Sequence, residues 1–286
     1  MKVIMFAGAD AMTDLDSSLT ALTVPDVQKL LKRYGFFDNI AEHFSNMLTE
    51  PFPALAASVL TQVGLFQSYT KKIGDQFILA GCSMGDLAKL ICAQVIDVET
   101  ALQGIEKFTQ GLQDVESGSI IHIKTAKGRD DVFFDDLKKF NLHLAMDQTT
   151  NDCLIAGREA DIIAWQETSE LAKNSKLQLI LPFPLHSPLM EPAFSRLEKF
   201  LIEKPMRRPS IQIVSSVEPG PLVEVDAIRN DLKFNILGQI RWQETFKWMS
   251  DVLKVTEFVN VGPVDTLKIL GSRIQTLAPV SIIDSV

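Results

Sequence analysis

The chain has 286 residues, enough for one large domain or two modest ones with a substantial buried core. Hydrophobic residues make up 46% of it and charged residues 22%, the balance of an ordinary globular protein. The net charge is -8 and no basic stripe is present, which argues against a nucleic-acid partner because phosphate neutralisation needs clustered Lys and Arg.

The cysteines and the apolar segments indicate the compartment. Cys82, Cys92 and Cys153 have neither metal-ligand nor disulfide spacing, so we expect no metal site and a reducing, cytoplasmic setting. No uninterrupted apolar run reaches the roughly 18 residues that cross a membrane, so no membrane partner is expected. The opening MKVIMFAG lacks the charged and long apolar regions of a signal peptide, and it predicts a first strand that ends at Gly8.

The first part of the chain predicts a layer of helices followed by a strand and a sharp turn. A polar, proline-interrupted segment follows the first strand, and apolar residues at helical spacing then predict several helices. The apolar run 77–80 predicts a buried strand, with a helix directly after the turn that follows it. The other predicted helices of this part cover residues 27–34, 39–48, 53–73 and 98–114.

The pattern changes after residue 117. Strands are predicted at 119–125, 142–148, 152–157 and 176–183, and helices at 130–140 and 159–174. Their order is β-α-β-β-α-β, the split βαβ order of a ferredoxin-like domain. The rest alternates again, with helices at 192–203, 242–253 and 264–275 and strands at 211–216, 257–262 and 278–283. We therefore expect an α/β fold in which residues 1–117 and 187–286 form a large, α/β-hydrolase-like subdomain with a parallel sheet, interrupted by a small ferredoxin-like subdomain at 118–186.

The turn after the predicted strand 77–80 contains the pattern G-x-S-x-G, centred on Ser83. A sharp strand-to-helix turn lifts such a serine into an exposed position, and the flanking glycines let neighbouring backbone come close. Ser83 is therefore the candidate nucleophile, although the same pattern also occurs as a purely structural turn.

A nucleophilic serine needs a base, usually histidine, and the chain has four histidines. His122 and His143 alternate with apolar residues in predicted strands, and His43 has no special setting on its helix. His186 lies in PFPLHSPLM, where prolines restrict the backbone at the junction between the two subdomains. A junction between subdomains favours a cleft, so His186 is the candidate base.

These motifs carry a family resemblance. GCSMGD and PLHSPLM, together with MFAG, VLTQVGLF, IRWQETFKW and FVNVGPVDTLKIL, resemble the malonyl-CoA:acyl carrier protein transacylase family in order along nearly the whole chain. That family has a large α/β subdomain interrupted by a ferredoxin-like one. An α/β-hydrolase, the other common owner of G-x-S-x-G, places its histidine late in the chain, and no histidine follows His186 here.

The resemblance implies a role for each matching residue. Ser83 would attack a thioester carbonyl while His186 takes its proton, and the backbone carbonyl of Asn235 would orient His186. Backbone N–H groups of Met84 and Ala9 would form the oxyanion hole. Gln62 matches a glutamine of the family's acyl pocket.

Three departures from the family concern the acyl pocket. Malonyl enzymes hold the free carboxylate with an arginine in the helix after the turn, and Phe108 takes that position here. Cys82 replaces a pocket histidine, and Leu185 replaces a phenylalanine. A carboxylate buried against these residues would be unpaired, at a cost of several kcal/mol, so we expect an uncharged acyl group. The paired asparagines of the family's small domain are also absent, and the matching stretch here is Met146-Asp147-Gln148.

The resemblance also implies the partners. The substrate would be an acyl thioester carried on the phosphopantetheine arm of an acyl carrier protein or on CoA, in polyketide or fatty-acid biosynthesis, with no other cofactor. The favoured activity is an acyl hydrolase that removes acyl groups from carrier proteins, as in relatives without the arginine. The alternatives are an acyltransferase that loads acetyl or another monocarboxylic unit onto a carrier protein, and a non-catalytic protein that only docks the carrier.

Overall fold

The centre of the larger subdomain is a six-stranded sheet with the order β10-β9-β1-β2-β7-β8. The computed structural model describes every residue except 1, 9–18, 73, 75, 126–127 and 286. All neighbouring strands of this sheet are parallel apart from the short β7–β8 pair. The strands are β1 (Lys2–Phe6), β2 (Phe77–Gly81), β7 (Ile213–Val214), β8 (Pro221–Leu222), β9 (Glu257–Val261) and β10 (Ser281–Asp284).

Helices cover both faces of this sheet, because successive side chains of its strands point to opposite faces. Ile4 and Phe6 of β1 face one core and Val3 and Met5 face the other. The first core lies under the helices α2 (Pro25–Tyr34), α3 (Ile40–Ser45), α4 (Pro51–Thr70), α5 (Gly85–Cys92), α6 (Val98–Gly111), α10 (Glu191–Glu203) and α11 (Val225–Leu237). The second lies under α12 (Trp242–Lys247), the π-helical turn η4 (Trp248–Val252) and α13 (Thr266–Arg273).

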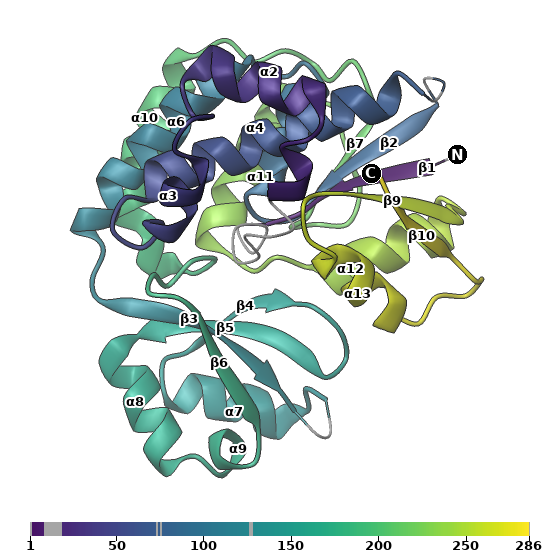
Figure 1. Cartoon of the computed structure of the whole chain (residues 1–286). Helices are drawn as coiled ribbons and strands as arrows, with labels where there is room; N and C mark the ends of the chain where they lie inside the picture. Colours follow the sequence, from purple (N-terminus) through teal and green to yellow (C-terminus); the bar gives the residue numbers. More distant parts are fainter. Residues whose placement is uncertain (1, 9–18, 73, 75, 126–127, 286) are drawn as a thin grey trace.

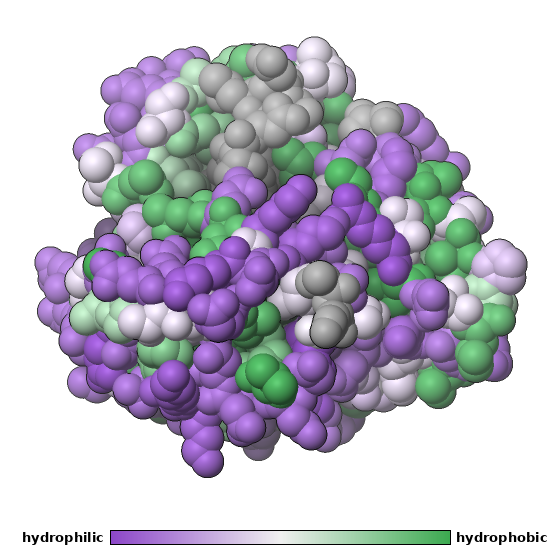
Figure 2. Space-filling view, turned by 90° about the horizontal axis from the view of Figure 1, so that it is seen from below, coloured by the Kyte–Doolittle hydropathy of each residue, from purple (hydrophilic) through white to green (hydrophobic). Residues whose placement is uncertain are grey.

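The smaller subdomain is an antiparallel sheet with the order β4-β5-β3-β6 and helices on one face (Figure 1). Its elements are β3 (Gly118–Lys124), α7 (Asp131–Lys139), β4 (His143–Asp147), β5 (Asp152–Arg158), α8 (Glu159–Thr168), α9 (Glu170–Lys173) and β6 (Lys176–Leu181). The helices cover the face turned away from the large subdomain, and the molecule seen from that side is mainly hydrophilic (Figure 2). The two-part α/β architecture expected from the sequence is confirmed.

Several elements differ from their predictions. Helix α11 and the two-residue strand β8 were not predicted. The helix was missed because the buried polar residues Asp231 and Asn235 interrupt its apolar stripe. The single helix expected at 159–174 is two helices that meet at Ser169. The Ser169 hydroxyl accepts a hydrogen bond from the N–H of Ala172 at 3.2 Å and so caps α9.

The end of β4 joins the two subdomains. Backbone hydrogen bonds link Asp147 and Ala145 to Ile240, at 3.0 and 2.9 Å. The Asp147 carboxylate, 3% exposed, accepts from the N–H of Gln243 at 3.3 Å. Burial, reinforced by the charge of Glu244, raises the pKa of Asp147 to about 7. The junction therefore contains a carboxyl group that ionises at a cost in stability.

We predict that Asp147→Asn stabilises the protein at alkaline pH. Because the pKa of Asp147 is raised from 3.8 to about 7 in the folded protein, the folded state loses stability as pH rises through this range. Above it, the ionised buried carboxylate costs on the order of 2 kcal/mol. Urea unfolding should show a gain of about that size at pH 8 and almost none at pH 4. The control is Asp226→Asn, because that side chain is 97% exposed. An equal gain at both pH values would contradict the prediction.

Candidate active site

Ser83 lies at the turn between β2 and α5, with a left-handed φ of 55°. The two glycines of the motif are required by close backbone approach. A Cβ on Gly81 would lie 2.7 Å from the backbone of Asp86, and one on Gly85 would lie 2.2 Å from the carbonyl oxygen of Phe6. The strained turn is therefore built against the end of β1, as a nucleophile turn requires.

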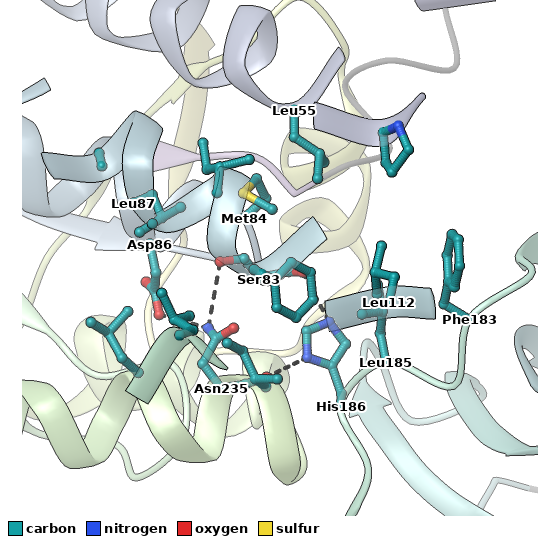
Figure 3. A pocket seen from close by; sticks show the side chains of 18 of the residues that line it. Leu55, Ser83, Met84, Asp86, Leu87, Leu112, Phe183, Leu185, His186 and Asn235 are labelled. Atoms are coloured by element: carbon teal, nitrogen blue, oxygen red, sulfur yellow. Dashed lines mark hydrogen bonds between the residues drawn. The ribbon is translucent and has the colours of Figure 1, made fainter. Parts of the chain in front are cut away.

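His186 reaches Ser83 from the other side of the cleft. Its Nε2 is 2.9 Å from the Ser83 Oγ, and its Nδ1 is 2.5 Å from the backbone oxygen of Asn235 (Figure 3). A carbonyl oxygen only accepts, so Nδ1 carries the proton and Nε2 is left to accept the serine proton. The structure thus brings together the three residues that the sequence assigned to proton transfer.

The loop around His186 is held rigidly. His186 has a φ of 58°, and the hydroxyl of Ser187 donates to the carbonyl of Pro184 at 2.6 Å. The His186 side chain is 6% exposed. Burial lowers its pKa below 6.5, although the Asn235 carbonyl and the charge of Asp86 act in the opposite direction. The imidazole is therefore neutral at pH 7, the state of a general base.

A buried polar network holds the side chain of Asn235 in place. Its side-chain amide donates to the Asp86 carboxylate at 2.7 Å and to Ser216 at 3.2 Å. Asp86 in turn lies 2.6 Å from the ammonium group of Lys89, and both side chains are almost fully buried. Lys89 also lies 3.9 Å from Asp231, whose pKa burial raises to about 6. The sequence analysis missed this network, since no local pattern signals a buried lysine in an apolar helix.

The expected oxyanion hole is described only in part. The N–H of Cys82 donates to the carbonyl of Phe6 at 3.0 Å, which holds the ends of β1 and β2 together. Gly8 lies beside Ser83 in the cleft, while Ala9 falls outside the described residues. Within the described chain, the N–H of Met84 makes no hydrogen bond and is available at the start of α5. Ala9 and Met84 remain the predicted donors.

The first of two cavities beside Ser83 is apolar. It has a volume of about 100 Å³ and includes Phe108 and Leu185 in its wall, as the sequence predicted. Figure 3 shows Leu55, Met84 and Leu87 on one side of Ser83 and Leu112, Phe183 and Leu185 towards the other. Among the described residues no arginine or lysine lines this cavity. A free carboxylate bound here would therefore have no cationic partner from these walls.

The second cavity, of about 290 Å³, lies between the subdomains and is more polar. It contains His122, whose Nε2 lies 3.2 Å from an oxygen of Asp152, and Arg273, which lies 3.9 Å from the same carboxylate. These side chains come from β3, β5 and α13, so only the tertiary fold brings them together. Ser83 and His186 line both cavities and connect them.

Two predicted pocket residues lie elsewhere. Cys82 lines the second cavity and not the apolar one, because it is at the end of β2 beside the β4 residue Met146, with the two sulfur atoms 3.9 Å apart. Gln62 lines neither cavity. It is buried on α4, and its amide donates to the carbonyl of Ala7 at 3.2 Å. Gln62 therefore supports the backbone that leads to Gly8, and its assignment to the acyl pocket is corrected.

The other groups considered in the sequence do not add to the site. His43 packs edge-on against Phe36, with ring centroids 5.8 Å apart, and His143 lines a shallow surface hollow beside α7. The three cysteines are buried and form no disulfide. The described part of the chain has no cluster of three or more His, Cys, Asp or Glu side chains that could hold a metal ion. None of its helices is both long and apolar enough to cross a membrane.

Comparison with known proteins identifies relatives for this geometry. The polyketide biosynthesis malonyl CoA-acyl carrier protein transacylase BaeC of Bacillus velezensis is 28% identical over 241 residues, covering 80% of this chain and 82% of the relative. The malonyl CoA-acyl carrier protein transacylase of Escherichia coli K12 is 24% identical over 237 residues, covering 79% and 75%. No protein-family model matches the chain.

Solved structures show the same fold. The malonyl CoA-acyl carrier protein transacylase of Coxiella burnetii has a TM-score of 0.82 at 20% identity, over 98% of this chain and 93% of that one. The complex of a type II polyketide acyl carrier protein with its malonyl-transacylase gives 0.80 at 19% identity, over 99% and 94%. The sequence relatives span both subdomains, and the shared fold extends over nearly the whole chain. In sequence over both subdomains and in fold, the chain is therefore similar to malonyl-CoA:acyl carrier protein transacylases.

Proposed function

We propose that the protein is an acyl-serine enzyme that accepts an uncharged acyl group from a pantetheine thioester. The observation that carries the proposal is the apolar cavity that opens onto the Ser83–His186 pair, with no cationic side chain among its described lining. A malonyl group would leave its carboxylate unpaired there, which is costly in a buried site. An acetyl or longer monocarboxylic acyl group carries no such charge.

The residues perform the chemistry in two half-reactions. In the first, the Ser83 Oγ attacks the thioester carbonyl while Nε2 of His186 takes the serine proton, and the N–H of Met84 faces the developing oxyanion. The C–S bond then breaks, His186 returns the proton to the departing sulfur, and the acyl group stays on Ser83. In the second, an acceptor loses its proton to His186 and attacks the ester carbonyl. The bond between the acyl carbon and the Ser83 Oγ then breaks, and His186 returns the proton to Oγ, which regenerates the free hydroxyl.

The acceptor in this proposal is a second pantetheine thiol, which makes the protein an acyltransferase. Two observations support a thiol. The relatives are named as transacylases, and a second cavity, lined in part by α13, also includes Ser83 and His186 in its wall. A transacylase of the same fold is known in complex with its acyl carrier protein, so a carrier protein is the proposed partner. Hydrolysis, the activity favoured in the sequence analysis, differs only in using water as the acceptor.

Intact-protein mass spectrometry tests the proposal. The enzyme is mixed with acetyl-, butyryl- and malonyl-pantetheine, and the mass of the acyl adduct is followed over time. We expect an adduct from the two neutral donors and only background labelling from malonyl. Adding a carrier protein with a free pantetheine thiol should discharge the adduct much faster than water does. Rapid discharge without an acceptor would show a hydrolase, and efficient malonyl labelling would overturn the proposed acyl class.

Introducing a cation tests the missing clamp directly. We predict that Phe108→Arg raises malonyl labelling of Ser83 by roughly 10- to 100-fold, because an arginine–carboxylate pair is bidentate and charge-assisted. Butyryl labelling should fall, since the arginine occupies apolar space. The matched control is Phe108→Met, which changes the shape without adding charge and should leave malonyl labelling at background. An unchanged malonyl rate in folded Phe108→Arg would show that Phe108 does not face the acyl group.

A further inference from the structure

The apolar cavity extends away from the catalytic pair between two antiparallel helices. Helix α10 begins at Glu191, five residues after His186, and so leads away from the site. Helix α6 runs in the opposite direction beside it. A Cβ on Gly111 would lie 2.6 Å from the Cα of Ala193, and one on Gly104 would lie 3.4 Å from the Leu197 side chain. The catalytic end of the cavity is therefore near Leu112, and its far end is near the start of α6.

The cavity continues to that far end. Leu201, which lines it, is ten residues beyond Glu191, or about 15 Å along α10 at a rise of about 1.5 Å per residue. Ala101 is seven residues before Phe108 on α6, so it lies about 10 Å deeper. Ile96 and Thr100 complete the wall at this end. A two-carbon acyl group on Ser83 would leave most of this length empty.

The volume sets the size of the group that fills the cavity. A single buried water requires about 10–15 Å³ measured in the same way, so 100 Å³ holds about seven to ten groups of that size. Apart from Ser83 and His186, the described walls are aliphatic or aromatic side chains except for Asp86, Asn235 and Thr100. No cationic side chain of the described wall would pair with an anionic substituent, and the largely apolar wall favours methylene groups as the occupant.

From this geometry we infer that the enzyme selects a medium-length, uncharged acyl chain of about six to ten carbons, which lies along α6 and α10. This inference rests on the proposed function, since it names the substrate class of the acyl-serine site. Each buried methylene favours binding about fourfold, which corresponds to about 0.8 kcal/mol. Acylation efficiency should therefore rise on the order of 100-fold between butyryl and octanoyl donors.

The experiment measures the initial rate of Ser83 acylation with a series of pantetheine thioesters, from acetyl to hexadecanoyl, at donor concentrations well below saturation. Wild-type protein should show a maximum between hexanoyl and decanoyl. Ala101→Met fills the far half of the cavity and should lower the ratio of the octanoyl to the acetyl labelling rate at least tenfold. The matched control is Gln103→Met, which adds the same side chain to the exposed face of α6 and should change neither rate.

A second variant keeps the inference testable if Ala101→Met does not fold. Leu201→Ala enlarges the far end and should move the optimum towards dodecanoyl. Rates that fall steadily from acetyl upwards, or variants that alter all donors equally, would overturn the chain-length inference while the proposed acyl-serine function stands. If no donor in the series labels Ser83, both the inference and the proposed function are wrong.

Discussion

Replacing Ser83 by alanine is expected to abolish the acyl-enzyme and to slow thioester turnover by about 10⁴-fold or more. The Ser83 hydroxyl donates a hydrogen bond to the His186 Nε2 at 2.9 Å, and a catalytic unit loses most of its activity when one of its residues is removed. Intact mass after incubation with a neutral acyl thioester, together with release of the free thiol, measures both effects.

His186→Ala should lose activity to a similar extent, and the pH dependence of the wild-type enzyme should identify the same group. Burial lowers the pKa of His186, so the neutral imidazole persists as pH falls to 6.5. Acylation should therefore decline only at pH values below 6.5.

The control is Ser272→Ala, an exposed serine on α13 that should leave turnover unchanged. A Ser83→Ala protein that still performed its role in the cell would show a carrier-docking protein and not an enzyme.

Lys89→Met is expected to cause the largest loss of stability, about 3–5 kcal/mol at pH 8. In the wild-type protein the Lys89 ammonium group lies 2.6 Å from the Asp86 carboxylate and 3.9 Å from that of Asp231. Its removal leaves both carboxylates buried without a counter-charge. The Lys89 Nζ also donates to the carbonyl of Val214 at 2.9 Å, and that bond is lost as well. Urea unfolding followed by circular dichroism gives the change in the free energy of unfolding.

The loss should be smaller at pH 5 than at pH 8. A buried carboxyl group whose pKa is raised above 3.8 stabilises the folded protein at low pH, and this contribution disappears as pH rises through the raised value. Asp231 already has a pKa of about 6 with Lys89 present. The control is Lys71→Met, which removes an ion pair of the same 2.6 Å length with Asp26 at a lysine that is 64% exposed. That change should cost less than about 1 kcal/mol, and equal losses would contradict the prediction.

Local patterns predicted most of the fold because they depend on short stretches of chain. The apolar run before Ser83 and the helical spacing after it identified β2, the turn and α5. The alternation of strands and helices after residue 117 identified the ferredoxin-like order. Helix α11 was missed because Asp231 and Asn235 are polar yet buried, and their partners, Lys89 and Asp86, are more than 140 residues away in the chain.

The sequence by itself determined three features: the turn that carries Ser83, the proline-rich loop that carries His186, and the order of the two subdomains along the chain. Each depends on backbone preferences that neighbouring residues set. Only the tertiary structure decided which of the two cavities beside Ser83 each predicted pocket residue lines. Phe108 lies in an apolar cavity between α6 and α10, whereas Cys82, one residue from Ser83, faces the polar cavity between the subdomains. Cavity shape and burial arise from packing between distant elements, and spacing along one chain does not specify them.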